Sequence, residues 1–269
     1  MQNKLCQANI ARQLIATCRG NLRGFGCDAL ARSGAWFGSW LEFPDKNFSR
    51  AQLGLSPELF LDLEAASGRL RSRPIKGTAA AGTPVAALAK SEKDAAELNM
   101  IVDLMRNDLG RVCEIGTVGV TQTRTIESHP TVHHGVAEVT GRLSPGVSTA
   151  DLLRACFPPG SVTGAPKVRA MQVIDELEPF RRGPYCGAVG YASRNGDLRL
   201  GVSIRTLAFE GRASNGFTGV QGSLAYGTGC GIVADSVPEL EFEESQHKAA
   251  VLRRLTPPAP SVAVLNSLT

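Results

Sequence analysis

The stretch Gly187-Ala-Val-Gly-Tyr-Ala-Ser-Arg-Asn-Gly-Asp-Leu-Arg-Leu-Gly-Val-Ser-Ile-Arg-Thr-Leu207 contains two extended runs separated by a turn. Asn195-Gly196 is a strong turn signal, because both residue types tolerate the left-handed backbone of a tight hairpin turn. The flanking runs therefore predict an antiparallel hairpin whose return strand covers 198–207. Alternate side chains of a strand face opposite ways, so Arg205 is expected to point away from the apolar face that contains Val202.

Outward from this hairpin, capping and periodicity signals predict a mixture of strands and helices. Serine–aspartate pairs three residues apart are typical helix starts, and apolar residues spaced three and four apart over 91–109 indicate one buried stripe. Residues 9–17 fit a helix or a strand equally well. The helix expected after Pro166 has an apolar face formed by Val168, Met171, Ile174 and Leu177. The other expected elements are strands over 59–63, 69–74 and 219–226 and helices over 148–156 and 236–255.

The composition is that of a globular chain with ample material for a core. Its 269 residues are 43% hydrophobic and 20% charged, a balance typical of soluble domains. The net charge of +4 is spread along the chain without a basic run. Nucleic-acid binding is therefore not expected, whereas a small anionic substrate is compatible with this charge.

Seven cysteines lie at positions without CxxC spacing, and their number is odd. This pattern argues against a zinc site or a disulfide framework and favours a reducing compartment. No apolar run approaches the length of a transmembrane helix, and the first residues do not resemble a signal peptide. We therefore expect a cytoplasmic protein without membrane contact, with one domain over 1–255 and a proline-rich disordered tail over 256–269.

Lys76 lies in the run Arg73-Pro-Ile-Lys-Gly-Thr78, as a lone amine between a proline and a glycine. The flanks suggest a strand end or a tight turn, and Gly77 lets the backbone approach another group closely. A desolvated lysine loses its proton more easily and becomes a nucleophile. A turn lysine in solvent is the alternative, and Lys76 taken alone favours that alternative.

Three charged residues share one face of the last expected helix, namely Glu241, Glu244 and Lys248. Two carboxylates one turn apart can bind Mg²⁺, which takes carboxylate, water and substrate oxygens. A solvated face with a Glu244–Lys248 salt bridge is the alternative, and the spacing alone favours it. Glu97, at the edge of the buried stripe over 91–109, is a third carboxylate that could approach from the opposite side.

Two glycine-rich segments could contact a ligand. Gly160-Ser-Val-Thr-Gly164 leads into a helix N-terminus, where backbone N–H groups and the helix dipole favour an anion, although the segment lacks the Walker A ending. Gly227-Thr-Gly-Cys-Gly231 fits either close backbone approach to a ligand or a simple bend. Arg205 could bind a carboxylate with two hydrogen bonds, and a solvent-facing arginine is the alternative.

Three further residues carry weaker signals. His133 and His134 are adjacent in an extended segment, so at most one of them faces a given site. Glu58, which precedes an expected strand, could act as a general acid or base. A structural hydrogen bond is the alternative for one of the two histidines.

Taken together, these segments resemble the chorismate-utilising enzymes, the family of the anthranilate, aminodeoxychorismate and isochorismate synthase large subunits. The resemblance extends from about residue 7 to 255. Lysine in Pro74-Ile-Lys-Gly-Thr78 resembles the aminodeoxychorismate synthase large subunits most closely, because anthranilate synthases carry alanine there. The matching segments are Ser56-Pro-Glu58, Pro74–Thr78, Glu97 with Ile101–Gly110, His133-His134, Gly160–Lys167, Ile204-Arg-Thr206 and Gly231–Ser236 through to Glu244.

The resemblance implies an α+β fold, with an antiparallel β-sandwich core and flanking helices. It implies conversion of chorismate and ammonia to 4-amino-4-deoxychorismate on the folate (p-aminobenzoate) route, with Mg²⁺ as cofactor. Ammonia would come from a separate glutamine amidotransferase subunit, because the sequence contains no visible glutaminase Cys-His-Glu arrangement. An anthranilate or isochorismate synthase is the alternative within the family. A non-catalytic chorismate-binding protein is the alternative outside the enzymes.

The resemblance also assigns roles to individual residues. Lys76 would attack the ring at C2 while the C4 hydroxyl leaves, and ammonia would then enter at C4 and expel Lys76. Glu58 would assist proton transfer, and His134 would lie beside the substrate. Glu97 and Glu244 would hold Mg²⁺, with Glu241 in the same acidic cluster. The residues implied to bind the carboxylates are Thr163, Gly164, Tyr191, Arg205 and Lys248.

Three features depart from the family pattern. Members usually have a further N-terminal region, which helps to complete the fold and carries the tryptophan pocket in relatives. Ala79-Ala-Ala81 replaces a more polar stretch, and Pro159 and Cys230 stand where glycines are common. None of these substitutions removes a residue with an implied catalytic role.

Overall fold

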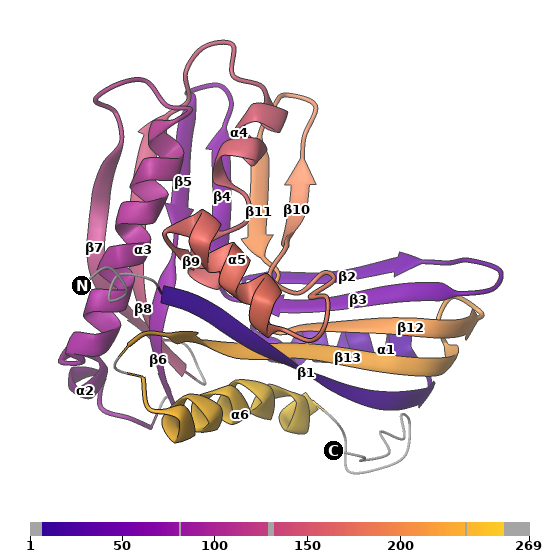
Figure 1. The fold of residues 1–269 in the computed structure, drawn as a ribbon. Helices are drawn as coiled ribbons and strands as arrows, with labels where there is room; N and C mark the ends of the chain where they lie inside the picture. Colours follow the sequence, from indigo (N-terminus) through magenta and orange to yellow (C-terminus); the bar gives the residue numbers. More distant parts are fainter. Residues whose placement is uncertain (1–6, 81, 129–131, 235, 256–269) are drawn as a thin grey trace. The chain divides into compact units, whose positions relative to one another are not determined.

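The computed structural model describes residues 7–80, 82–128, 132–234 and 236–255 (Figure 1). Backbone contacts divide the chain into two compact units, each assembled from separate segments. Unit 1 comprises Met1–Asn9, Glu58–Asp175 and Ala188–Val202, and unit 2 comprises Ile10–Pro57, Glu176–Gly187 and Ser203–Thr269. The single domain over 1–255 stays a prediction, and the expected tail over 256–269 lies outside the described residues.

Unit 1 is built on a seven-stranded antiparallel sheet with the order β10-β11-β4-β5-β8-β6, in which β7 also pairs with β8. Its elements are β4 (Leu59–Glu64), β5 (Arg69–Arg73), β6 (Ile75–Ala80), α2 (Val85–Ala89), α3 (Glu92–Gly110), β7 (Gly119–Ser128), β8 (Val132–Arg142), α4 (Thr149–Cys156), η2 (Gly160–Val162), β9 (Gly164–Ala165), β10 (Ala188–Ala192) and β11 (Leu198–Val202).

Helix α3 covers this sheet beside β6, β7 and β8 (Figure 1). The Ser91 side chain caps the helix by accepting a hydrogen bond from the Asp94 backbone N–H, as the sequence predicts. The stripe that contains Leu98, Ile101 and Leu109 is fully buried. Burial of one such side chain stabilises a fold by roughly 1.5–3 kcal/mol, so this stripe fixes the position of the helix.

Unit 2 contains a second sheet with the strand order β2-β3-β12-β13-β1. Its core gathers around Phe209 and Phe217, whose rings meet edge to face with centroids 6.1 Å apart. The first two residues of β1, Gln7 and Ala8, belong to unit 1, where they pair with β9. The elements are β1 (Gln7–Gly20), α1 (Leu22–Ser33), β2 (Phe37–Phe43), β3 (Ser49–Ser56), β12 (Thr206–Ser214), β13 (Gly219–Ile232) and α6 (Pro238–Leu255), and α5 (Lys167–Leu177) spans the boundary between the units.

The predicted hairpin is present, but its return strand is shorter than expected. β11 ends at Val202, and Arg205 adopts a left-handed backbone with φ of 52°. Arg205 therefore does not lie on the polar face of one continuous strand. The strand expected over 219–226 is longer than predicted. It is β13, which continues to Ile232, so Gly227-Thr-Gly-Cys-Gly231 is strand rather than loop.

The helix expected after Pro166 is present as α5, but its apolar face is not buried. Val168 is 70% exposed and Leu177 is 62% exposed, while Ala170 is the buried position. Helical periodicity identifies the apolar side of a helix without identifying what covers that side. The undecided segment over 9–17 is extended and forms part of β1.

The α+β class with antiparallel sheets and flanking helices is confirmed. The capped helix expected over 148–156 is confirmed as α4, where Ser148 and Asp151 form a full capping box. Across the described residues, every helix is too short or too polar to cross a membrane.

Candidate active site

Lys76 lies on β6 with only 11% of its side chain exposed. Its Nζ is 3.3 Å from Asn9 Oδ1 and 3.6 Å from Glu97 Oε2. Gly77 has φ of 81°, and a Cβ there would lie 2.9 Å from the Asp94 carboxyl carbon, so only glycine fits beside α3. The alternative of a turn lysine in bulk solvent is therefore excluded.

Glu97 reaches Lys76 from helix α3 and also accepts a hydrogen bond from Gln7. Gln7 Nε2 lies 3.2 Å from Glu97 Oε2, and Gln7 is 99% buried. Gln7 Oε1 is buried too, and it meets no hydrogen-bond donor within the part of the chain that the structure describes. A buried acceptor of this kind is costly unless a ligand or water supplies the donor.

Strand β1 brings Asn9 to Lys76 and Gln7 to Glu97, and no sequence motif marks either residue. Gln7 pairs with Ala165 of β9, and a Cβ at Gly164 would lie 1.8 Å from the Gln7 carbonyl oxygen. The glycine that ends the predicted anion loop thus permits this close strand contact. Gln7 and Asn9 lie at the start of a segment whose residue pattern fits a helix or a strand equally well. That pattern therefore does not indicate which side chains face a site.

His134 lies on β8, paired in register with Thr78 of β6, two residues beyond Lys76. Its Nδ1 is 2.9 Å from Thr78 Oγ1, and the side chain is buried. His133 faces the other way and its Nδ1 is 2.8 Å from Ser128 Oγ. The two histidine side chains therefore lie on opposite faces of the strand, as predicted.

Three other predicted residues lie in unit 1. Glu58 is 96% buried immediately before β4. The Thr163 hydroxyl donates to the Pro159 carbonyl oxygen at 3.0 Å, which stabilises the loop itself. Tyr191 is 56% exposed on β10 and lines a groove of about 330 Å³ beside Asp62 and Arg199. The substrate-binding roles of Thr163, Gly164 and Tyr191 stay predictions.

Unit 2 brings Glu241 and Glu244 together on α6, and Cys230 of β13 joins them. One ligand atom from each of the three lies within 4.8 Å of the others. Glu241 is buried and accepts a hydrogen bond from Ser236 Oγ at 2.8 Å, whereas Glu244 is exposed. These carboxylates have the chemistry that Mg²⁺ prefers, so the residues fit a divalent cation.

Lys248 forms the salt bridge that the sequence offered as an alternative. Its Nζ lies 2.7 Å from Glu244 Oε1 and donates to the Gly229 carbonyl oxygen at 2.9 Å. The salt bridge and a metal site are compatible only if the ammonium group shares Glu244 with the cation. Glu244 is half exposed, so this pair contributes little stability by itself.

Helix α6 is attached to β13 by hydrogen bonds spaced along the strand. Tyr226 Oη donates to the Lys248 carbonyl oxygen, Thr228 Oγ1 to that of Ser245, and Cys230 Sγ to that of Glu241. Alternate residues of a strand point to the same side, so one face of β13 carries all three donors. This attachment fixes the register between the acidic face of α6 and the sheet.

Arg205 is one of two residues in this part of unit 2 whose backbone is strained. Arg205 and Cys186 both have left-handed backbone angles, with φ of 52° and 65°. Such angles cost a non-glycine residue roughly 1–2 kcal/mol and are concentrated at functional sites. The Tyr185 ring covers Gly227, where a Cβ would lie 2.3 Å from the ring. Desolvation raises the pKa of Tyr185, so its phenol stays neutral and can act as a hydrogen-bond donor. No sequence motif marks this residue.

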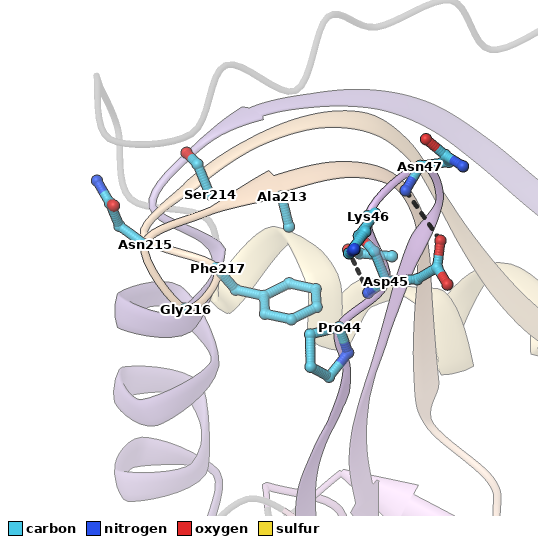
Figure 2. Close-up of a pocket in the computed structure, with 10 residues that line it drawn as sticks. Pro44, Asp45, Lys46, Asn47, Ala213, Ser214, Asn215, Gly216 and Phe217 are labelled. Carbon is cyan, nitrogen blue, oxygen red and sulfur yellow. Dashed lines mark hydrogen bonds between the residues drawn. The ribbon is translucent and has the colours of Figure 1, made fainter.

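A separate open pocket of about 590 Å³ lies at the ends of two hairpins of unit 2 (Figure 2). Pro44 and Phe217 line it together with Lys46, and Asp45 accepts hydrogen bonds from the Asn47 and Phe48 backbone N–H groups. These hydrogen bonds lower the pKa of Asp45. None of the residues predicted for catalysis is among those that line this pocket.

Unit 1 thus holds a buried lysine beside a glutamate of α3, and unit 2 holds two glutamates on one face of α6. A sequence model of the chorismate binding enzymes matches residues 1–254, and the chain belongs to that family.

Individual relatives agree with this assignment. The chain is 43% identical to aminodeoxychorismate synthase component 1 from Klebsiella aerogenes over 249 residues, which cover 90% of the chain and 52% of the relative. It is 44% identical to anthranilate synthase component 1 from Aquifex aeolicus over 209 residues, which cover 75% and 40%. The crystal structure of anthranilate synthase component I from Streptococcus pneumoniae superposes with a TM-score of 0.76 at 32% identity, covering 92% and 53%. The chain thus spans about half the length of the relatives it matches.

Proposed function

We propose that this protein converts chorismate and ammonia to 4-amino-4-deoxychorismate through a covalent adduct on Lys76. The single observation that carries the proposal is the enclosed Lys76 amine, 3.3 Å from Asn9 Oδ1 and 3.6 Å from Glu97 Oε2. An amine with so little access to water is suited to act as a nucleophile. A relative that is 43% identical over 90% of the chain bears the name of this activity.

In the proposed reaction Lys76 Nζ forms a bond to ring carbon C2. The ring double bond shifts, the C–O bond at C4 breaks, and a proton delivered to the leaving oxygen releases water. Ammonia then forms a bond at C4, the double bond returns, and Lys76 leaves with its electron pair. One hard substitution is thereby divided into two easier steps.

Other residues support these steps. Glu58 is the proposed proton donor, since a buried carboxyl group can hold a proton for a poor leaving group. His134, fixed by Thr78, is proposed to border the substrate, and Arg205 to bind a carboxylate. Glu97, Glu241 and Glu244 are the proposed Mg²⁺ ligands. The bound ion would supply positive charge for the substrate carboxylate.

Ammonia is proposed to come from a separate glutamine amidotransferase. Relatives named component 1 imply a second component, which is consistent with this arrangement. The location in the cytoplasm stays a prediction.

An anthranilate synthase is the second candidate, because a relative of that name has a similar identity. The test is a product assay of the purified chain with chorismate, ammonium and Mg²⁺. We expect 4-amino-4-deoxychorismate, and a mass increase on Lys76 when ammonium is omitted. Lys76→Ala should abolish both signals while chorismate still binds. Anthranilate or isochorismate as the product would overturn the proposal, and binding without turnover would indicate a non-catalytic protein.

A further inference from the structure

Asn9 is a neutral residue in contact with the Lys76 amine. Its Oδ1 lies 3.3 Å from Lys76 Nζ, from the β1 side of unit 1. Glu97 approaches the same amine from α3 at 3.6 Å. Two oxygen acceptors on different elements of the fold therefore flank one nitrogen.

The orientation of the Asn9 amide is fixed by a second contact. Asn9 Nδ2 donates to the Thr163 carbonyl oxygen at 3.2 Å, and the Asn9 backbone N–H donates to the same oxygen at 2.7 Å. A carbonyl oxygen can accept only from the NH₂ end of the amide. Since Nδ2 must face Thr163, Oδ1 must face Lys76.

Of these two contacts, the one to Asn9 is a hydrogen bond and the one to Glu97 is an ion pair. Lys76 Nζ donates to Asn9 Oδ1 at 3.3 Å, whereas Nζ and Glu97 Oε2 lie 3.6 Å apart. Because Asn9 is held to Thr163 through both its backbone and its side chain, its amide oxygen offers the lysine nitrogen an acceptor at a defined place. An uncharged amide does this without adding a second negative charge beside the amine.

We propose that Asn9 is a positioning residue that holds the Lys76 nitrogen in place for its attack on the ring carbon. This inference rests on the proposed function and deepens it, because it names what holds the nucleophile in line. Asn9 takes no part in bond making: the C–N bond forms between Lys76 and C2, and the C–O bond at C4 breaks. The role also explains why the β1 strand carries a polar residue beside the nucleophile.

Single-turnover mass spectrometry of the Lys76 adduct tests the inference. The unmutated chain and Asn9→Leu, which is close in size but lacks the acceptor, are each mixed with chorismate and Mg²⁺ without ammonium. We expect the adduct to form about 10- to 100-fold more slowly in Asn9→Leu, the loss typical of a nucleophile displaced by a fraction of an ångström. The dissociation constant for chorismate, measured by calorimetry, should change by less than about twofold, since chorismate binding does not need the hydrogen bond between Asn9 and Lys76.

Asn47→Leu is the matched control, because it removes the same amide from an exposed hairpin. Its adduct rate should equal that of the unmutated chain. If Asn9→Leu fails to fold, Asn9→Ser is measured in the same way, since its shorter side chain also withdraws the acceptor. A parallel loss of chorismate binding and thermal stability in the Asn9 variants would overturn the inference in favour of a purely structural role.

Two further outcomes separate this inference from the proposed function. An adduct that forms at an unchanged rate in Asn9→Leu overturns the positioning role and leaves the proposed reaction standing. Failure of the unmutated chain to form any adduct on Lys76 overturns both.

Discussion

At the scale of single residues, two buried charges outside the site show what the unit 1 core depends on. Lys167 Nζ lies 2.6 Å from Asp108 Oδ2 and also donates to the Cys156 carbonyl oxygen at 2.7 Å. Asp108 is 98% buried at the end of α3. Burial raises the pKa of Asp108, and the hydrogen bond from Lys167 opposes that shift.

Removal of Lys167 should therefore be costly and dependent on pH. Lys167→Met leaves a buried carboxylate without its cation, and we expect a loss of about 3–5 kcal/mol in urea unfolding at pH 7. Because the folded pKa lies above the ordinary value of 3.8, the loss should shrink as the pH falls through that folded pKa and Asp108 becomes neutral. Arg154→Met, which breaks an exposed ion pair on α4, should leave the midpoint unchanged. An equal loss at every pH would contradict this account.

Gly77 shows how a residue without a side chain can position a catalytic group. Gly77→Ala must place a Cβ 2.9 Å from the Asp94 carboxyl carbon at φ of 81°, so we expect at least about 1–2 kcal/mol of destabilisation. Activity should fall by about tenfold or more, because Lys76 moves with the strand. Gly110→Ala is the control, since open space surrounds Gly110 at the end of α3, and its stability should be unchanged or slightly raised. Thermal melts measure the stability of both variants and rate assays measure their activity. A Gly77→Ala variant as stable and as active as the unmutated chain would contradict this account.

At the scale of elements, the sequence predicted best those helices and turns whose local residue pattern is compatible with a single backbone structure. Ser91 with the stripe from Leu98 to Leu109 specifies α3, and Asn195-Gly196 specifies the β10–β11 turn. Arg205 was misplaced because alternation cannot reveal where a strand ends in a left-handed residue. The exposure of the apolar face of α5 could not be foreseen, because periodicity does not identify the covering surface.

The candidate site was predictable to a similar extent. Glu97 and the α6 carboxylates could be selected from the sequence by charge and helical position, and Lys76 as a lone amine between a proline and a glycine. Gln7, Asn9 and Tyr185 could not, because their importance comes from contacts made by residues distant in the chain. Such contacts are a property of packing rather than of local pattern.

The α6–β13 pair predicts an unusual preference among metal ions. Cys230 adds a sulfur donor within 4.8 Å of the Glu241 and Glu244 oxygens, and thiolates select soft cations over Mg²⁺. We expect EDTA to abolish product formation, Mg²⁺ to restore it, and Cd²⁺ to compete with Mg²⁺. Cys230→Ser should weaken Cd²⁺ binding in calorimetry by about tenfold or more while Mg²⁺ binding stays the same. Cd²⁺ affinity that is insensitive to this change would contradict a role for the thiol.

At the scale of the whole molecule, the course of the chain links the stabilities of the two units. The chain passes from one unit to the other after Asn9, Pro57, Asp175, Gly187 and Val202, so neither unit is a continuous segment. Unfolding of either unit releases the ends of segments that the other must hold in place. Since such coupling favours all-or-none unfolding, we infer that the units do not melt independently.

The two tryptophans make this coupling measurable. Trp36 and Trp40 both belong to unit 2, so their fluorescence reports that unit, whereas far-ultraviolet circular dichroism reports both. Leu98→Ala removes a fully buried side chain from unit 1 and should cost about 2–5 kcal/mol. We expect it to lower the urea midpoint of the tryptophan signal as much as that of the dichroism signal. Leu53→Ala, the matched change in the unit 2 core, should shift both signals in the same way. If Leu98→Ala leaves the midpoint of the tryptophan signal unchanged, the units unfold separately although the chain passes between them five times.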